Sequence, residues 1–75
     1  MTGPAAGRTI DCLGRPCPVP VIELARALPT VGIGEVLGVL SDDPAAAVDL
    51  PAWCRMRAHE WLGVEGRSHR VRRLH

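Results

Sequence analysis

The residue of this chain best suited to nucleophilic chemistry is a cysteine held between two prolines in the stretch RPCPVP, residues 15–20. Pro18 and Pro20 would fall in the first turn of a helix, where a backbone N–H has no intrahelical partner, so proline loses nothing there. If that helix begins at Pro18, Cys17 is its N-cap, at the positive end of the helix dipole, which favours thiolate over thiol. The sequence therefore predicts an exposed, nucleophilic Cys17 on a rigid loop. A buried cysteine in a proline turn is the alternative.

The residues around Cys17 limit the chemistry that it can perform. Gly14, Arg15 and Pro16 lead into the cysteine, and the charge of Arg15 would favour a thiolate. No His or Asn has a motif spacing to Cys17 that indicates a hydrolytic dyad, and there is no CxxC pair for thioredoxin-type exchange. We therefore expect the thiol to work alone, which suits carrying a chemical group.

The two other cysteines are predicted to be core residues, because Cys12 and Cys54 lie on apolar faces. A zinc site made of Cys12, Cys17, Cys54 and His59 has cysteine and histidine at x4 spacings. On a single helix, however, Cys54 and His59 would lie about 140° apart around the axis, so they could not easily bind one ion. We expect no metal and no cofactor, and His59 is predicted to be a solvated helix residue.

Composition excludes several classes of protein. All nine basic residues are Arg, which excludes lysine Schiff-base chemistry and a Walker-type phosphate lysine. No apolar run reaches the roughly 18 residues of a membrane span, and the start MTGPAAG does not resemble a signal peptide. With three cysteines, an odd number, a reducing cytoplasm is the expected location. Residues 1–7 are predicted to be a flexible tail, and residues 8–75 a single domain.

The first half of the chain predicts a strand, a helix and a second strand. RTIDCL, residues 8–13, alternates as a strand. The helix from Pro18 would turn a stripe of four apolar residues inward, and Pro29 would end it. EVLGVLS, residues 35–41, is typical of a strand buried on both faces, with Gly38 allowing a helix to pack closely. The stripe comprises Val21, Leu24, Ala25 and Leu28.

The second half predicts another helix and a hairpin. Asp43 is the expected N-cap, with Pro44 at the first helical position, and Pro51 would kink or restart the helix. Two strands would follow within residues 64–74, around a turn near Ser68. The inward face of the helix is predicted to carry Cys54, Ala58, Trp61 and Leu62, with Gly63 just beyond its end.

The order strand, helix, strand, helix, strand, strand predicts an α/β (α+β) two-layer sandwich, with both helices on one face of a four-stranded mixed sheet. A right-handed crossover makes the first two strands parallel, so the loops that follow them share one edge of the sheet. Ligands and chemistry gather at that edge in open α/β sheets. We therefore expect Asp42 and Asp43 to lie beside Cys17 and to face its partners.

The C-terminal segment is strongly basic. It is predicted to be a charged edge strand that discourages aggregation, and a docking site for an acidic protein stays open. Direct nucleic-acid binding is not expected, because the segment lacks aromatic stacking residues, and Trp53 and Trp61 are predicted to belong to the core. The basic residues are Arg67, His69, Arg70, Arg72, Arg73 and His75.

The combination of motifs resembles the TusA-like (SirA-like) sulfur-carrier family. Its hallmark CPxP motif after a D-x-x-G strand end appears here in DCLGRPCPVP, followed by a DDP segment and an aromatic–Cys pair in the second helix. The resemblance covers residues 8–75. It implies the fold of the C-terminal domain of translation initiation factor three. Carried over by position, the matching residues are Asp11, Gly14, Cys17, Pro18, Pro20, Asp42, Asp43, Pro44, Trp53 and Cys54.

The resemblance also implies a sulfurtransferase activity. Cys17 would accept sulfane sulfur as a covalent persulfide from a cysteine desulfurase or rhodanese-type donor, and would pass it to an acceptor protein without any membrane association. The acceptor pathway stays open among transfer-RNA thiolation, molybdenum-cofactor maturation, sulfur oxidation and selenium handling. Arg15 and Pro16 depart from the hydrophobic or basic pair of many members, which puts partner choice in doubt. The alternative function is a non-catalytic module that uses Cys17 as a redox or metal-sensing thiol.

Overall fold

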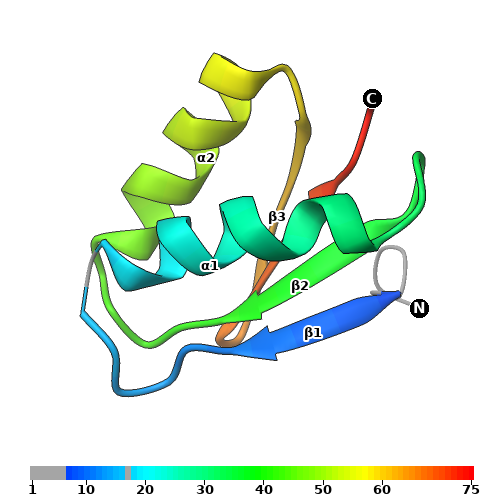
Figure 1. Cartoon of the computed structure of the whole chain (residues 1–75). Coiled ribbons are helices and arrows are strands. Elements are labelled where there is room, and N and C mark those ends of the chain that lie inside the picture. The colour runs from blue at the N-terminus through cyan, green and yellow to red at the C-terminus, as the bar shows by residue number, and fades with distance from the viewer. Residues whose placement is uncertain (1–6, 17) are drawn as a thin grey trace.

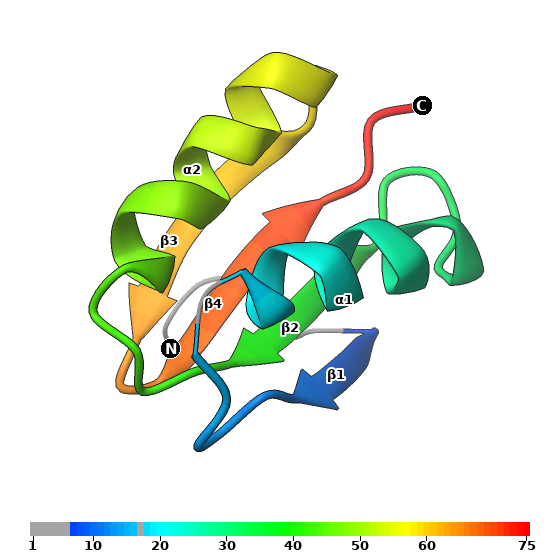
Figure 2. The same cartoon turned by 60° about the vertical axis from the view of Figure 1, so that its left-hand side comes forward.

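The computed structural model describes residues 7–16 and 18–75, so the predicted tail, apart from Gly7, and Cys17 itself lie outside the described residues. Two helices cover one face of a four-stranded sheet with the strand order β1-β2-β4-β3 (Figures 1 and 2). β1 and β2 run parallel, and the other two pairs are antiparallel. The predicted α+β sandwich is confirmed. Its elements are β1 (Arg8–Asp11), α1 (Val19–Ala27), a 3-10 turn (Leu28–Thr30), β2 (Val36–Leu40), α2 (Ala46–Arg57), β3 (Glu60–Glu65) and β4 (Ser68–Arg72).

A small aliphatic core joins the two layers. Leu37 and Val39 of β2 and Val71 of β4 are fully buried against Leu24 of α1 and Leu50 of α2. Because side chains alternate along a strand, the odd-numbered residues of β2 face the helices. The burial of their apolar area stabilises the packing of the helices on the sheet. β1 and β2 pair in parallel and are connected through α1, as the sequence predicted.

The inward stripe of α1 differs by one position from the predicted one. Leu24 and Leu28 are buried as expected, but Ala25 is exposed and Ala27 is buried in its place. Ala25 and Ala27 are both small and apolar, so the helical periodicity alone did not determine which of them faces the core.

The prediction that Gly38 lets a helix pack closely on the sheet is wrong, because Gly38 does not face the helices. Its neighbours Leu37 and Val39 belong to the core beneath the helices, so alternation along the strand directs Gly38 to the opposite face of the sheet. There it pairs in register with Thr9 and Arg70.

The second helix ends earlier than predicted. Ala58 adopts the left-handed conformation, with φ 59°, and the N–H groups of Ala58 and His59 both donate to the carbonyl of Cys54. This cap ends α2 at Arg57, so Trp61 and Leu62 lie in β3 rather than on the helix. α2 is also a single element that contains Pro51, so the predicted restart there is wrong, whereas the predicted kink is untested.

The hairpin turns at Gly66 and Arg67, slightly before the predicted position, and pairs Glu65 with Ser68. The basic strand β4 lies between β2 and β3, so it is not an edge strand, and that prediction is wrong. The physical reason is that the hairpin returns into the sheet beside β2, where antiparallel pairing satisfies both sides of the β4 backbone.

Two ion pairs and a ring contact account for much of the polarity of β4. Arg72 pairs with Glu60 at 3.6 Å, and Arg70 with Glu65 at 3.9 Å. His69 points into the core, and its ring centroid lies 5.8 Å from that of Trp61. Trp53 and Trp61 are partly buried and pack on the edge of the core, in partial agreement with the prediction.

Candidate functional site

The chain turns tightly between β1 and the stretch that leads to Cys17. Asp11 Oδ1 accepts a hydrogen bond from the Leu13 N–H at 2.9 Å, and the Cys12 carbonyl accepts one from the Arg15 N–H at 3.1 Å. Gly14 has a φ of +75°, a backbone conformation that residues other than glycine rarely adopt. These local bonds hold the backbone immediately before Pro16.

On the other side of Cys17 the backbone enters α1 through a second turn. The Pro16 carbonyl accepts the Val19 N–H at 3.0 Å, and the Pro18 carbonyl accepts the Ile22 N–H at 3.1 Å. Pro20 is fully buried and fixes the first turn of α1 against the core. The residues flanking Cys17 are therefore hydrogen-bonded within the fold.

The predicted cap position is wrong by one residue. The helix begins at Val19, and Pro18, with φ −98° and ψ 16°, occupies the N-cap position that the sequence assigned to Cys17. The Val19 N–H donates to the Pro16 carbonyl, so it is not a free donor for an anionic sulfur. The prolines delay the first regular helical turn, and a sequence pattern does not resolve a helix boundary to one residue.

The acidic loop after β2 contacts the loop before Cys17. The Cys12 N–H continues the parallel ladder by donating to the Leu40 carbonyl at 2.8 Å, which brings both loops to one edge. There Asp42 Oδ1 accepts the Gly14 N–H at 3.1 Å. The predicted adjacency of the two loops is confirmed, whereas a role of Asp42 in receiving partners stays a prediction.

Asp43 organises the entry to α2, although the helix starts later than predicted. Its Oδ1 accepts the Ala45 N–H at 2.9 Å and its carbonyl accepts the Ala46 N–H at 3.0 Å, but regular helix begins at Ala46, with Ala45 as the N-cap residue. Asp43 thus closes a turn that precedes the helix. Ser41, which was not predicted as a site residue, is buried, and its Oγ accepts the Asp43 N–H at 3.3 Å. Its signal was the SDD pattern, since serine commonly bonds the backbone two residues onward.

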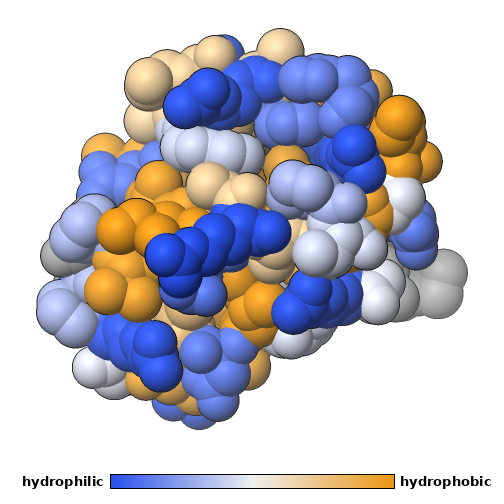
Figure 3. All heavy atoms as spheres, viewed as in Figure 1, coloured by the Kyte–Doolittle hydropathy of each residue, from blue (hydrophilic) through white to orange (hydrophobic). Residues whose placement is uncertain are grey.

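The surface around this edge is accessible and partly apolar. Gly14, Arg15, Pro16, Pro18 and Asp42 are exposed. Two large apolar side chains near the starts of the helices are also exposed, Ile22 by 44% and Val48 by 69%. Apolar side chains gather over the beginning of α1 and of α2 in the space-filling view (Figure 3). Both charged and apolar contacts are available to a protein that approaches this loop.

The other two thiols lie in the core, as predicted. Cys12 and Cys54 are each 1% exposed and belong to the aliphatic cluster. Burial raises the pKa of the Cys54 thiol to about 11, against a small opposing effect of Arg55. Burial, followed by the nearby Glu23, also raises the pKa of Cys12. Both groups are neutral thiols at pH 7 and poor nucleophiles.

His59 is not a helix residue, contrary to the prediction. It follows the α2 cap and is partly buried between the rings of Trp53 and His75, because the left-handed Ala58 ends the helix before it. Within residues 7–16 and 18–75, no group of three or more His, Cys, Asp or Glu side chains could hold a metal ion. In the same ranges, neither helix combines the length and the apolar character needed to cross a membrane.

Comparison with known proteins places this geometry in a family. Residues 8–72 match the family described as "Sulfurtransferase TusA". The chain belongs to the TusA family. A curated relative from Archaeoglobus fulgidus, named "Putative sulfur carrier protein", is 39% identical over 56 residues, which are 75% of this chain and 77% of the relative. The chain also superposes on the crystal structure of a SirA-like protein from Desulfitobacterium hafniense with a TM-score of 0.65 and 33% sequence identity. The superposition covers 85% of this chain and 90% of that one.

Membership of the TusA family indicates that the chain has a sulfur-carrier role. It agrees with the resemblance based on the CPxP, DDP and aromatic–Cys motifs. The aromatic–Cys pair, Trp53 and Cys54, indeed lies inside α2. A carrier of this kind needs protein partners that deliver and receive the sulfur.

Proposed function

We propose that the chain is a sulfur-relay protein in which Cys17 accepts sulfane sulfur as a persulfide and transfers it to a protein acceptor. The observation that carries the proposal is the contrast among the three cysteines. Two are buried in the core with raised pKa values, which leaves the cysteine of the CPxP motif as the candidate nucleophile. Both neighbours of that cysteine, Pro16 and Pro18, are exposed and hydrogen-bonded into the fold.

The transfer needs no external oxidant or reductant. The Cys17 thiolate attacks the terminal sulfur of a donor persulfide, a new S–S bond forms, and the donor thiolate leaves with the electron pair of the broken S–S bond. In the second half of the relay, an acceptor thiolate attacks the terminal sulfur on Cys17 and releases the Cys17 thiolate. The sulfane sulfur keeps its oxidation state throughout, and the carrier is regenerated.

The neighbouring side chains have supporting roles in this proposal. Arg15 supplies positive charge two residues before the thiol, and the dipole of α1 favours the anionic sulfur of thiolate and persulfide alike. Asp42 fixes the Gly14 turn, and with Asp43 it gives partners an acidic edge to recognise. The donor is expected to be a cysteine desulfurase or a rhodanese-type protein in the cytoplasm, and the acceptor a downstream sulfur-transfer protein.

The test is persulfide loading across three single variants. Wild type, Cys17→Ser, Cys12→Ala and Cys54→Ala are incubated with a persulfide donor, and added sulfur is mapped by mass spectrometry of intact protein and peptides. Cys17→Ser should lose loading completely, while the two alanine variants should still load. Circular dichroism provides the folding control. Parent-level loading of Cys17→Ser, or loss of loading in a folded Cys54→Ala protein, would overturn the proposal.

A further inference from the structure

A concave site lies between the C-terminal halves of the two helices, away from the loop that contains Cys17. Its volume is about 300 Å³, at the small end of ligand-binding pockets. Val19, two residues after the CPxP cysteine, and Leu28, which lines this pocket, are about 14 Å apart along the helix axis at the usual rise per residue. The pocket is therefore separate from the site of the proposed sulfur chemistry, and its lining residues have no role in that mechanism.

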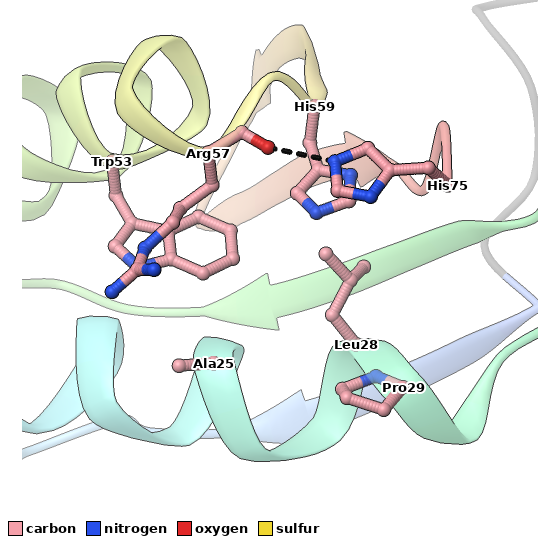
Figure 4. A pocket seen from close by; sticks show the side chains of 7 residues that line it. All are labelled: Ala25, Leu28, Pro29, Trp53, Arg57, His59 and His75. Atoms are coloured by element: carbon pink, nitrogen blue, oxygen red, sulfur yellow. Dashed lines mark hydrogen bonds between the residues drawn. The ribbon is translucent and has the colours of Figure 1, made fainter.

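Three rings stack along one side of this pocket. The His59 ring lies 5.7 Å from the ring of Trp53 and 4.5 Å from that of His75, with interplanar angles of 15° and 12°. In Figure 4, Trp53 and Arg57 extend from α2 toward α1, and Leu28 points up toward the two histidines. Ala25, Leu28 and Pro29 form an apolar side opposite them. A flat apolar ligand could pack against the aromatic side and contact the aliphatic side chains at once.

Hydrogen bonds hold the histidine side of the pocket in place. His59 Nδ1 accepts the Leu74 N–H at 3.1 Å, and His75 Nε2–H donates to the Arg57 carbonyl at 2.9 Å. The guanidinium of Arg73 donates to the Val31 carbonyl at 2.7 Å, which ties the same segment to the end of the 3-10 turn. The C-terminal segment is thus hydrogen-bonded to His59, to Arg57 of α2 and to Val31 after the 3-10 turn. These bonds preorganise the pocket.

The charge of the pocket selects the sign of its ligand. Arg57 lines it, and no lining side chain is a carboxylate. The Arg73 guanidinium lies close by and donates to the main-chain oxygens of Pro29 at 3.4 Å and His75 at 3.0 Å. His59 is a neutral ring whose pKa is lowered by burial and by the nearby His75 and Arg73. Cationic groups beside stacked rings and aliphatic side chains complement an anionic group on a flat apolar body.

From these features we infer that the pocket binds a small planar aromatic anion, a ring system that carries one carboxylate, sulfonate or phosphate group. The ring would pack against Trp53 and the aliphatic side chain of Leu28, and the anionic group would be bound by the Arg57 guanidinium, whose N–H groups match carboxylate and phosphate geometry. This binding is independent of Cys17.

The experiment is a titration of the full chain with 2-naphthoate, followed by ¹⁵N–¹H NMR. Saturable shifts should centre on Leu28, His59 and the Trp53 indole N–H. The uncharged analogue 2-naphthylmethanol and the ring-free anion acetate test the two halves of the ligand, and each should bind more weakly than 2-naphthoate. A Cys17→Ser protein should bind 2-naphthoate as wild type does, which separates this site from the sulfur relay.

The matched variants are Arg57→Gln and Arg55→Gln, which remove the same charge from the last turn of α2. Arg57→Gln should weaken binding by at least about fivefold, as expected for a lost charge-assisted contact, and Arg55→Gln by less than about twofold. Equal losses in both variants would overturn the inference, because they would indicate attraction to net charge alone. Unsaturable shifts, shifts centred elsewhere, or equal binding of 2-naphthylmethanol would overturn it as well.

Discussion

The loop on both sides of Cys17 and the core that holds Cys12 and Cys54 offer a thiol opposite surroundings. In the core, aliphatic side chains exclude water and raise the pKa of both cysteines. At the loop, exposed prolines, a positive glycine φ and hydrogen bonds to the acidic loop fix the backbone at the surface. We infer that position in the fold, rather than the number of cysteines, determines how reactive each thiol is.

The largest expected effect is on alkylation rates in the native protein. At pH 7, iodoacetamide should modify Cys17 at least about a hundredfold faster than Cys54, because a thiol with a pKa near 11 is about 0.01% thiolate. Peptide mass spectrometry after short exposures measures the three rates separately. In urea all three cysteines should react similarly, which serves as the control. Comparable native rates at Cys17 and Cys54 would remove the basis of the comparison.

A second effect concerns stability at alkaline pH. The pKa of Cys54 is raised in the folded state from 9.0 to about 11, so the folded protein binds the thiol proton more tightly than the unfolded chain does. The contribution is complete below pH 9 and is lost as the pH rises toward 11. By linkage, the free energy of unfolding should fall over that range by up to about 2–3 kcal/mol. Urea unfolding at several pH values measures it, and a Cys54→Ala protein should show a shallower decline.

A smaller effect tests how the acidic loop is built. Asp43→Ala removes the acceptor of the Ala45 N–H and should lower the free energy of unfolding by about 1 kcal/mol. Asp43→Asn keeps an acceptor oxygen at the same position and should cost less. The measurement is urea unfolding of the two variants beside wild type. Identical losses would show that the turn does not depend on this bond.

The smallest expected effect separates the charge of Asp42 from its hydrogen bond. Asp42→Asn keeps an oxygen for the Gly14 N–H, whereas Asp42→Ala removes both the charge and the acceptor. If the acidic edge receives partners, both variants should weaken donor binding by a few fold, as usual for an exposed interfacial charge. Calorimetric titration with the sulfur donor provides the measurement. Unchanged donor and acceptor binding in Asp42→Ala and Asp43→Ala would contradict the partner-facing role.

Much of the fold was predictable because its strongest patterns are local. The buried run at residues 35–41, the helix that ends near Pro29, and the right-handed crossover predicted the parallel β1–β2 pair. That pair alone brings the two loops to one edge, so the contact between Gly14 and Asp42 followed from topology. The burial of Cys12 and Cys54 followed from their apolar neighbours.

The errors occur where tertiary pairing or a cap decides the outcome. Trp61 and Leu62 continue a helical spacing, yet Ala58 takes a left-handed conformation and the following residues pair with β4. The long-range pairing of β4 with β2 makes β4 a central strand, which its basic composition did not indicate. Neither a left-handed alanine nor strand order has a reliable local signature.

The pocket between the helices was also not predictable from the sequence. Trp53, His59 and His75 are spread over more than twenty positions and meet only because α2, its cap and the segment after β4 converge. His59 was assigned to a solvated helix face, so its stacking partners could not be deduced. Constellations of this kind need the backbone path, whereas the CPxP motif is contiguous in the chain.

The most direct test of the central claim uses a protein that retains Cys17 as its one cysteine. The double variant Cys12→Ala/Cys54→Ala is loaded from a donor persulfide, separated from the donor, and offered to an acceptor thiol, with intact-mass spectrometry of carrier and acceptor at each step. We expect one added sulfur atom per chain, which then appears on the acceptor as the carrier returns to its original mass. A folded double variant that takes up no sulfur, or that holds sulfur without transferring it to any thiol acceptor, would contradict it.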